Sequence, residues 1–363
     1  MAGTLKVGGN IIATHTGVEG TGQVSLTNVS LGGGAFMFRN KIINGNFDFW
    51  QRGTSQTSAG YGSADRWNND HSGSSKTASQ QAFTLGQTEV PGNSKYYLRH
   101  VVTSVSGSGN YCLTQQKIEG VSTLAGKTAT LSFWAKADSN KNIATEFSQD
   151  FSTGGSPSST VNGIGVTTHS LTTSWQKFTT TVSIPSISGK TLGTDGRDYL
   201  HLVIWFDSGS TYSSRNNSLG QQSGTFDIAQ VQLEIGTAAT PFEHRPIGVE
   251  LSLCQRYFEK SYDLADGIGG NSAKGMIRAN ARDSGSFHRG DIRFKVSKRS
   301  LPEIKIYAYY SGTLGHYRDT SNGVDRAALS QYIGENSFEA YASGGVMSTG
   351  ALHGFHYTAN SEL

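Results

Sequence analysis

Residues 127–137, KTATLSFWAKA, alternate between apolar and more polar side chains with a period of two. Leu131, Phe133 and Ala135 form the apolar series, and the residues between them form the other. Successive side chains of a β-strand point to opposite faces of the sheet, so this alternation predicts a strand with one face in a core. The segment therefore favours a β fold.

Further runs alternate in the same way, and segments rich in Gly, Ser and Asn separate them. These runs are YYLRHVVT at 96–103, WQKFTTTVSI at 175–184, YLHLVIWF at 199–206 and TFDIAQVQLEI at 225–235. Short strands joined by turn-rich links are typical of antiparallel sandwiches and jelly rolls. The sequence thus predicts an all-β chain with an antiparallel jelly-roll domain over residues 40–245.

The chain after residue 245 changes character. Residues 247–260 place Leu251, Cys254 and Phe258 three and four positions apart, which predicts a short helix within a linker over 246–262. Short alternating runs then return, for example at 303–310. We expect a smaller C-terminal β domain over residues 263–363.

The first 39 residues are Gly-rich and alternate only weakly. Such a segment can form short strands but cannot bury a core by itself. Residues 1–39 are therefore predicted to be an N-terminal arm that needs a second surface, and an unstructured terminus is the alternative.

Composition excludes several classes of protein. The 363 residues include 46 Gly, 46 Ser and 35 Thr, whereas charged residues make up 16 % and Pro only 6 residues. Gly does not recur at every third position, so this is not a collagen, and the charge is too low for a charge-driven disordered chain. A net charge of +3 predicts neither a nucleic-acid nor a membrane-surface partner. No apolar run is long enough to predict membrane insertion.

Several segments together resemble tail-fibre and related receptor-binding proteins of tailed bacteriophages. The segments are NGNFDFWQRGTS at 44–55, ADRW at 64–67, LSFWAKA at 131–137, VQLEIGTAATPFEHR at 231–245, ELSLCQRYF at 250–258 and HYTANSEL at 356–363. The central domain of those proteins resembles the jelly roll of carbohydrate-binding modules. The opening MAGTLKV is similar to the virion-attaching start of some such fibres.

The resemblance implies a virion component, on the tail or the capsid surface, that is made in the host cytoplasm. It would be a homotrimer that attaches to a host surface polysaccharide without cleaving it, and residues 1–39 would contact other virion proteins. Trimer formation also has a physical motive, because neighbouring copies can satisfy unpaired backbone groups at sheet edges. Two alternatives remain: a purely structural virion protein, such as a capsid-decorating fibre or a connector, and a polysaccharide depolymerase.

Three tryptophans, Trp134, Trp175 and Trp205, fall on the more polar series of their strands. A flat aromatic ring with polar neighbours suits a pyranose, which stacks its apolar face and hydrogen-bonds through its hydroxyls. These residues are therefore candidate glycan-binding residues. The alternative is that a loop, a sheet edge or a neighbouring subunit covers them.

A second candidate surface lies in the C-terminal domain. Residues 274–299 carry eight Lys and Arg against two Asp, and Arg289 and Arg293 are the basic residues that we assign to glycan binding. Tyr307 and Tyr309 follow, on the opposite series from Ile306, and could add aromatic contacts. Such a patch could bind phosphate or acidic sugars. The alternative is a solvated strand face that opposes aggregation, with the tyrosines packed along a trimer axis.

Asp48 and Asp227 are candidate metal ligands, because jelly-roll carbohydrate modules often hold a structural Ca²⁺ between their first and last strands. Calcium needs six to eight oxygen ligands, and the pattern offers two carboxylates. The prediction is a protein without a cofactor, and a structural Ca²⁺ at this pair is the alternative.

Sequence motifs of common enzyme classes are absent. The chain contains no GxSxG, HExxH or P-loop motif, and no GxGxxG that follows a strand. Glycan hydrolysis needs two carboxylates at a defined separation, and no acidic cluster indicates such a pair. We therefore predict that the chain is not an enzyme.

Overall fold

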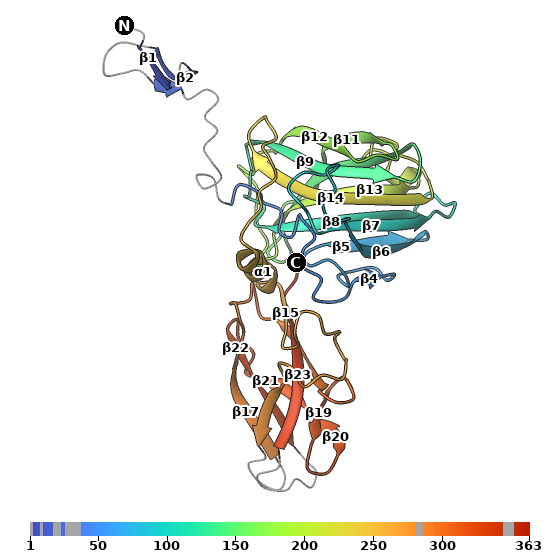
Figure 1. The fold of residues 1–363 in the computed structure, drawn as a ribbon, viewed down its shortest axis with the longest axis vertical. Coiled ribbons are helices and arrows are strands. Elements are labelled where there is room, and N and C mark those ends of the chain that lie inside the picture. The colour runs from blue at the N-terminus through green and yellow to red at the C-terminus, as the bar shows by residue number, and fades with distance from the viewer. Residues whose placement is uncertain (1–2, 8–9, 17–22, 26–37, 281–285, 344–351) are drawn as a thin grey trace. The chain divides into compact units, whose positions relative to one another are not determined.

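The computed structural model describes residues 3–7, 10–16, 23–25, 38–280, 286–343 and 352–363. Most of the regular structure in these residues is antiparallel β-strand, which confirms the all-β prediction (Figure 1). The chain divides into two compact units, Met1–Arg39 and Asn40–Leu363. In the first unit, β1 (Gly3–Val7), β2 (Asn10–Thr16) and β3 (Gln23–Ser25) form a sheet in that order.

Two antiparallel sheets pack face to face in the second unit (Figure 1). The β13 sheet has the order β11-β10-β13-β8-β5, and the β14 sheet has the order β12-β9-β14-β7-β6-β4. The strands are β4 (Ser55–Gln56), β5 (Asn68–Ser72), β6 (Ser75–Ala82), β7 (Tyr96–Thr103), β8 (Tyr111–Glu119), β9 (Thr128–Ala137), β10 (Lys141–Asp150), β11 (Val161–Leu171), β12 (Gln176–Ser183), β13 (Tyr199–Ser208) and β14 (Gly224–Ile235). We call this pair of sheets the sandwich.

The core of the sandwich is made by the apolar series of its strands. Leu131 and Phe133 on β9 belong to the same buried cluster as Leu202 and Ile204 on β13. Each such side chain contributes about 1.5–3 kcal/mol by leaving water. The predicted alternation is therefore confirmed in both sheets, and it decides which residues point outward.

Helix α1 spans Ile247–Gln255, so the predicted helix over 247–260 is too long. Phe258 begins β15 (Phe258–Lys260), which pairs with β23 (Leu352–Asn360), and it does not continue a helical stripe. The buried face of α1 carries Glu250 and Cys254 instead of Leu251. No helix in the described ranges is long and apolar enough to cross a membrane.

The remaining strands form two further sheets. The β23 sheet contains β15, β16 (Ile277–Asn280), β18 (Glu303–Ala308), β19 (His316–Asp319), β20 (Val324–Ala327) and β23, and the β22 sheet contains β17 (Ser286–Arg293), β21 (Leu329–Gln331) and β22 (Ser337–Ser343). Ile306 and Phe355 of the first sheet share one buried cluster with Ile292 and Phe338 of the second. The two sheets therefore pack against each other.

Charged residues join the C-terminal end of the chain to the sandwich. Arg66 forms an ion pair with Glu362, and its guanidinium lies 3.4 Å from the ring centroid of Tyr257. Arg52 lies in the same way over Phe258, at 3.7 Å, and also pairs with Glu362. These two arginines are almost fully buried, as is Glu362. Removal of the Glu362 carboxylate would therefore leave buried positive charge uncompensated.

Neutral histidines buried in the sandwich predict acid sensitivity. Burial lowers the pKa of His169 to about 4 and that of His201 to about 3. The unfolded chain takes up protons near pH 6.5 while the folded chain does not, so the free energy of unfolding should fall as the pH drops from about 6.5 towards 4. Urea unfolding at pH 7.5, 6 and 5 measures this slope, and His169→Gln should make it shallower. Identical pH profiles for the two proteins would contradict the assignment.

Candidate functional site

The three candidate tryptophans do not share one surface. Trp134 and Trp175 belong to one aromatic cluster at the outer face of the β14 sheet. Trp205 belongs to a separate cluster at the outer face of the β13 sheet. A single chain therefore cannot use all three as one platform.

Trp205 packs beneath a loop. Its side chain is 1 % exposed, and the ring of Tyr212, from the short 3-10 helix Ser210–Tyr212, lies 5.3 Å from it. The indole Nε1 donates to Glu146 at 3.2 Å, and Arg215 forms an ion pair with the same carboxylate at 2.6 Å. Trp205 therefore follows the packing alternative, and the structure offers no sugar-binding face at this position.

Trp175 is a buried member of the aromatic cluster on the outer face of the β14 sheet. It is 8 % exposed, and the rings of Phe83 and Tyr97 lie 5.4 and 5.3 Å from it. The Lys136 ammonium lies 5.2 Å from its ring centroid. Such aromatic and cation–π contacts hold a ring in place. Trp175 therefore packs within this surface and offers little area to a ligand.

Trp134 is partly exposed and lies in a groove with a volume of about 500 Å³. We call this hollow the Trp134 groove. Its lining residues are Pro91, Gly92, Ser132, Trp134, Lys177, Gln230, Ala239, Pro241, Phe242 and His244. The volume falls in the range of small-ligand sites, and the lining combines apolar rings with a few polar groups, as such sites do.

The floor of the groove follows from strand register. Trp134 on β9 lies opposite Lys177 on β12 and opposite Ala229 on β14. Residues directly opposite each other in an antiparallel pair point to the same face, so the exposed Lys177 side chain stands beside the indole. On the other side of the Trp134 ring, the small side chain of Ala229 leaves open space, and the walls of the groove border this space.

The first wall, Pro91 and Gly92, is held by a β-bulge in β14. The register of β14 against β9 shifts between Ala229 and Gln232, and Gln230 has φ of 50°. The bulge re-aims the Gln230 side chain, whose Nε2 donates to the Pro91 carbonyl and, at 2.8 Å, to Ser94 Oγ. Gln230 is therefore a positioning residue for this wall.

The second wall, residues 239–244, is anchored by the next two outward-facing side chains of β14. Glu234 accepts hydrogen bonds from the backbone N–H and the hydroxyl of Thr240, at 2.8 and 2.7 Å. Gln232 Oε1 accepts from the Glu243 backbone N–H at 2.8 Å. These two side chains are buried, and the wall satisfies their polar atoms.

The two walls meet at Gly92. This glycine has φ of +85°, and a Cβ built on it would lie 2.4 Å from Nε2 of His244. A side chain at this position would be strained and would displace the imidazole. Gly92 thus lets the two walls approach each other over the floor.

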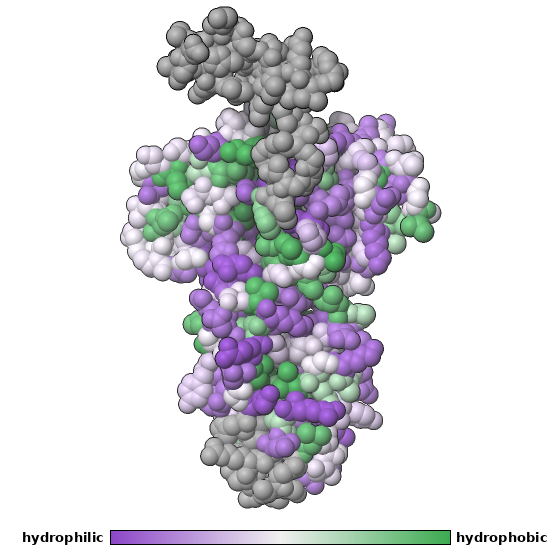
Figure 2. All heavy atoms as spheres, turned by 60° about the vertical axis from the view of Figure 1, so that its left-hand side comes forward, coloured by the Kyte–Doolittle hydropathy of each residue, from purple (hydrophilic) through white to green (hydrophobic). Residues whose placement is uncertain are grey.

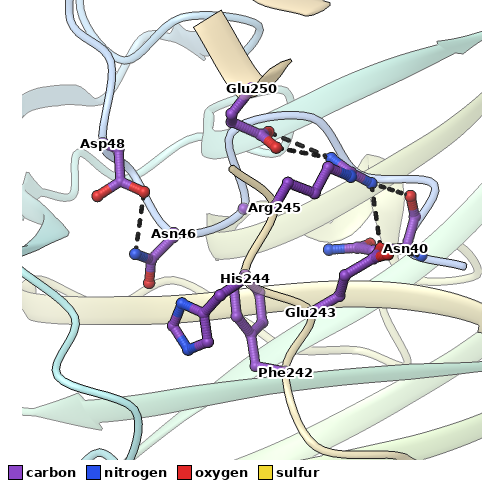
Figure 3. Close-up of a pocket in the computed structure, with 9 residues that line it drawn as sticks. Asn40, Asn46, Asp48, Phe242, Glu243, His244, Arg245 and Glu250 are labelled. Atoms are coloured by element: carbon purple, nitrogen blue, oxygen red, sulfur yellow. Dashed lines mark hydrogen bonds and ion pairs between the residues drawn. The ribbon is translucent and has the colours of Figure 1, made fainter. Parts of the chain in front are cut away.

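At the end of the second wall, the side chains of residues 242–245 point alternately to two sides (Figure 3). Phe242 and His244 point to one side and contact each other, with ring centroids 5.0 Å apart. Arg245 points to the other side, where it forms an ion pair with Glu250 at 2.9 Å. Partial burial lowers the pKa of His244, and the nearby Asp48 carboxylate opposes this shift. The buried ion pair therefore fixes the segment that presents Phe242 and His244 to the groove.

The proposed calcium ligands have different surroundings. Both oxygens of Asp227 accept hydrogen bonds from Arg99, at 2.7 and 2.8 Å. Asp48 accepts a hydrogen bond from Asn46, and burial raises its pKa. No group of three or more His, Cys, Asp or Glu suited to a metal ion occurs among the described residues. The structure therefore gives this calcium pair no support.

The candidate residues of the C-terminal sheets are not brought together. Ile292 and Ile306 face the shared core, so Arg293 and Tyr307, each one residue further along, point to the opposite outer faces of the two packed sheets. Tyr309 lies beyond the end of β18, in the turn that follows it, so strand alternation does not place it beside Tyr307. Arg289 is exposed on β17 with Arg293, which pairs with Asp291 at 3.0 Å.

The basic stretch 274–299 is likewise divided. Lys298 is buried and forms an ion pair with Glu259 at 2.6 Å, so it presents no charge to solvent. Residues 281–285, which include Arg282, lie outside the described residues. The predicted basic patch therefore does not form as a single surface from the described part of this stretch.

Exposed large hydrophobic side chains are scattered over the surface. Leu85, Ile235 and Tyr332 are examples, with exposed fractions of 100, 58 and 80 %. On the face drawn in Figure 2, hydrophobic residues form small separate areas among hydrophilic ones. Single exposed hydrophobic residues are normal for a folded chain, so they carry no functional assignment.

No protein-family model and no curated protein matches the chain. Among solved structures, it is similar to the enzymatically active domain of tailspike protein 4 of bacteriophage CBA120, with 12 % identity, a TM-score of 0.30, and 55 % of this chain and 22 % of that chain covered. A family 11 carbohydrate-binding module from Clostridium thermocellum aligns with 12 % identity and a TM-score of 0.29, over 52 % of this chain and 98 % of the module. A xylan-binding domain from Paenibacillus barcinonensis aligns with 11 % identity and a TM-score of 0.28, over 51 and 94 %. The chain therefore spans about a fifth of the solved tailspike domain and nearly all of each module.

Sequence reasoning missed most of the groove. Lys177, Gln230 and His244 were not among the candidate residues predicted from the sequence. One signal was present: Gln230, Gln232 and Glu234 alternate with Val231 and Leu233 just before the segment GTAATPFEHR. Polar side chains in a central strand need buried hydrogen-bond partners, and here the walls provide them.

The contrast between the tryptophans predicts different effects on stability. Trp205→Ala removes a buried ring and leaves Glu146 without one donor, so it should lower the free energy of unfolding by about 3–5 kcal/mol. Trp134→Ala should lower it much less, because the indole is partly exposed. Urea denaturation of both variants at pH 7.5 checks this order. Equal losses would contradict the burial described above.

Proposed function

We propose that this chain binds a bacterial surface glycan at the Trp134 groove and leaves it uncleaved. The observation that carries the proposal is the partly exposed indole of Trp134 on the floor of a groove whose walls are held by buried hydrogen bonds. A preorganised aromatic floor lets a sugar bind without the cost of ordering loops.

The lining matches the chemistry of a pyranose. The apolar face of a sugar ring can stack on Trp134, and Phe242 offers further apolar area. Ser132, Lys177 and His244 present hydroxyl, ammonium and imidazole groups to the same space, where they can bond to sugar hydroxyls. The arrangement supports recognition of one or a few sugar units within a longer glycan.

The absence of acids in the groove supports binding without hydrolysis. Of the described residues that line it, none is Asp or Glu. Glycosidases act with two carboxylates that flank the scissile bond. A groove lined in this way can hold a glycan but does not offer the pair of carboxylates that glycosidases use.

The proposal also assigns the chain to a phage virion, as a receptor-binding fibre or tail protein. It is supported by the resemblance of segments such as NGNFDFWQRGTS and VQLEIGTAATPFEHR to such proteins. In this proposal three copies assemble, and residues 1–39 contact other virion proteins. The burial of Trp175 and Trp205 favours the second candidate, a purely structural virion protein without glycan affinity.

Replacement of Trp134 tests the proposal. An array of bacterial surface polysaccharides and their oligosaccharides first identifies the glycans that the full chain binds. Trp134→Ala should then weaken the binding of each by about tenfold or more, because it removes the stacking surface. Tyr332→Ala, which removes an exposed aromatic ring outside the groove, should leave affinity unchanged. Isothermal titration calorimetry measures both.

Two results would contradict the proposal. If the folded chain bound no glycan on the array, the structural candidate would replace it. If binding released new reducing ends from the polysaccharide, the depolymerase alternative would replace it.

A further inference from the structure

We infer that the Trp134 groove selects acidic saccharides, in which a carboxylate lies on the sugar stacked over the indole or on its neighbour. This inference rests on the proposed function and concerns the class of glycan bound. It follows from which charges line the groove and from how the carboxylates around it are already paired.

The charge of the lining is one-sided. Among the described residues of the lining, Lys177 is the only Lys, Arg, Asp or Glu. In the described part of the chain, its ammonium forms no ion pair with a carboxylate. His244 adds an imidazole that can donate a hydrogen bond. A ligand carboxylate would therefore meet donors and no carboxylate among the lining residues. Asp48, the carboxylate near His244, lies outside this lining and accepts a hydrogen bond from Asn46.

The two carboxylates on the same face of β14 are both occupied. Asp227 binds Arg99 through both oxygens, at 2.7 and 2.8 Å. Glu234 accepts from Thr240 through both oxygens, and Gln232 donates to one of them at 2.8 Å. Neither is placed to neutralise Lys177, so the ammonium remains available to a ligand.

A second cation lies along the same strand face. Lys136 is two residues from Trp134 on β9, so it points to the same side of the sheet. Its ammonium lies over Trp175, and its cross-strand neighbour is Asp227. Arg99 already binds Asp227, so Lys136, Asp227 and Arg99 together carry a net positive charge. This charge adds positive potential beside the groove.

The position of Lys177 determines which part of a bound sugar its ammonium would contact. Lys177 and Trp134 are directly opposite each other in the β12–β9 pair, where Cβ atoms lie about 4.5–5.5 Å apart. A lysine stem extends the ammonium to the rim of a ring that stacks on the indole. A carboxylate there would form a charge-assisted hydrogen bond, which is stronger than a bond to a neutral hydroxyl.

Matched glycans and a matched lysine variant test this inference. The array carries acidic oligosaccharides, among them oligogalacturonides and sialylated oligosaccharides, each beside its carboxyl-reduced form and beside neutral oligosaccharides. The full chain should bind acidic members at least tenfold more tightly than their reduced forms. Lys177→Met, which keeps the stem and removes the charge, should abolish most of this preference. Lys127→Met removes an exposed lysine at the turn before β9 and should leave the preference intact.

Failure of the inference and failure of the proposed function give different results. If neutral and carboxyl-reduced glycans bind as well as acidic ones, and Trp134→Ala still abolishes binding, the selectivity is overturned and the glycan site stands. An acidic preference that Lys177→Met leaves unchanged also overturns the inference. If no member of the array binds to the folded chain, the proposed function itself fails.

Discussion

The structure of the candidate site depends on one constraint, namely that the polar side chains of a central strand must be satisfied where they are buried. β14 lies between β9 and β7, and its apolar side chains enter the core of the sandwich. Its other face carries Gln230, Gln232 and Glu234, which are also buried. Unpaired, each would destabilise the fold by about 1–3 kcal/mol. The segments that pair with them are the two walls of the groove, so the stability of the strand and the shape of the site have a common origin.

Period-two alternation was enough to predict much of the sandwich. The runs at 96–103 and 199–206 match β7 and β13 closely, because one face of each is strongly apolar. β10 escaped notice because polar residues occupy both of its faces, and Thr145 interrupts the core-facing series of Ile143 and Phe147. Glu146, for example, is fully buried on the face away from the core, where Arg215 and Trp205 bind it, so polar and apolar positions both lie inside.

The candidate site was predictable only in part, because alternation shows which side of a sheet a residue takes but not what covers that side. Trp134 and Trp205 have the same sequence pattern, yet the chain after β13 folds over Trp205, whereas Trp134 remains open to the groove. The end of α1 was misplaced for a related reason. Phe258 fits a helical stripe locally, but its backbone pairs with Asn360 of β23, about a hundred residues later in the chain.

An experimental structure of the intact assembly with a bound acidic oligosaccharide would test the central claim most directly. The account predicts a sugar ring stacked on Trp134, between Gly92 and the segment 239–244, with its carboxylate beside Lys177. A groove filled by a neighbouring copy of the chain, or a sugar bound elsewhere on the surface, would contradict it. In the first case Trp134 would be a packing residue of the assembly, as Trp205 is within the single chain.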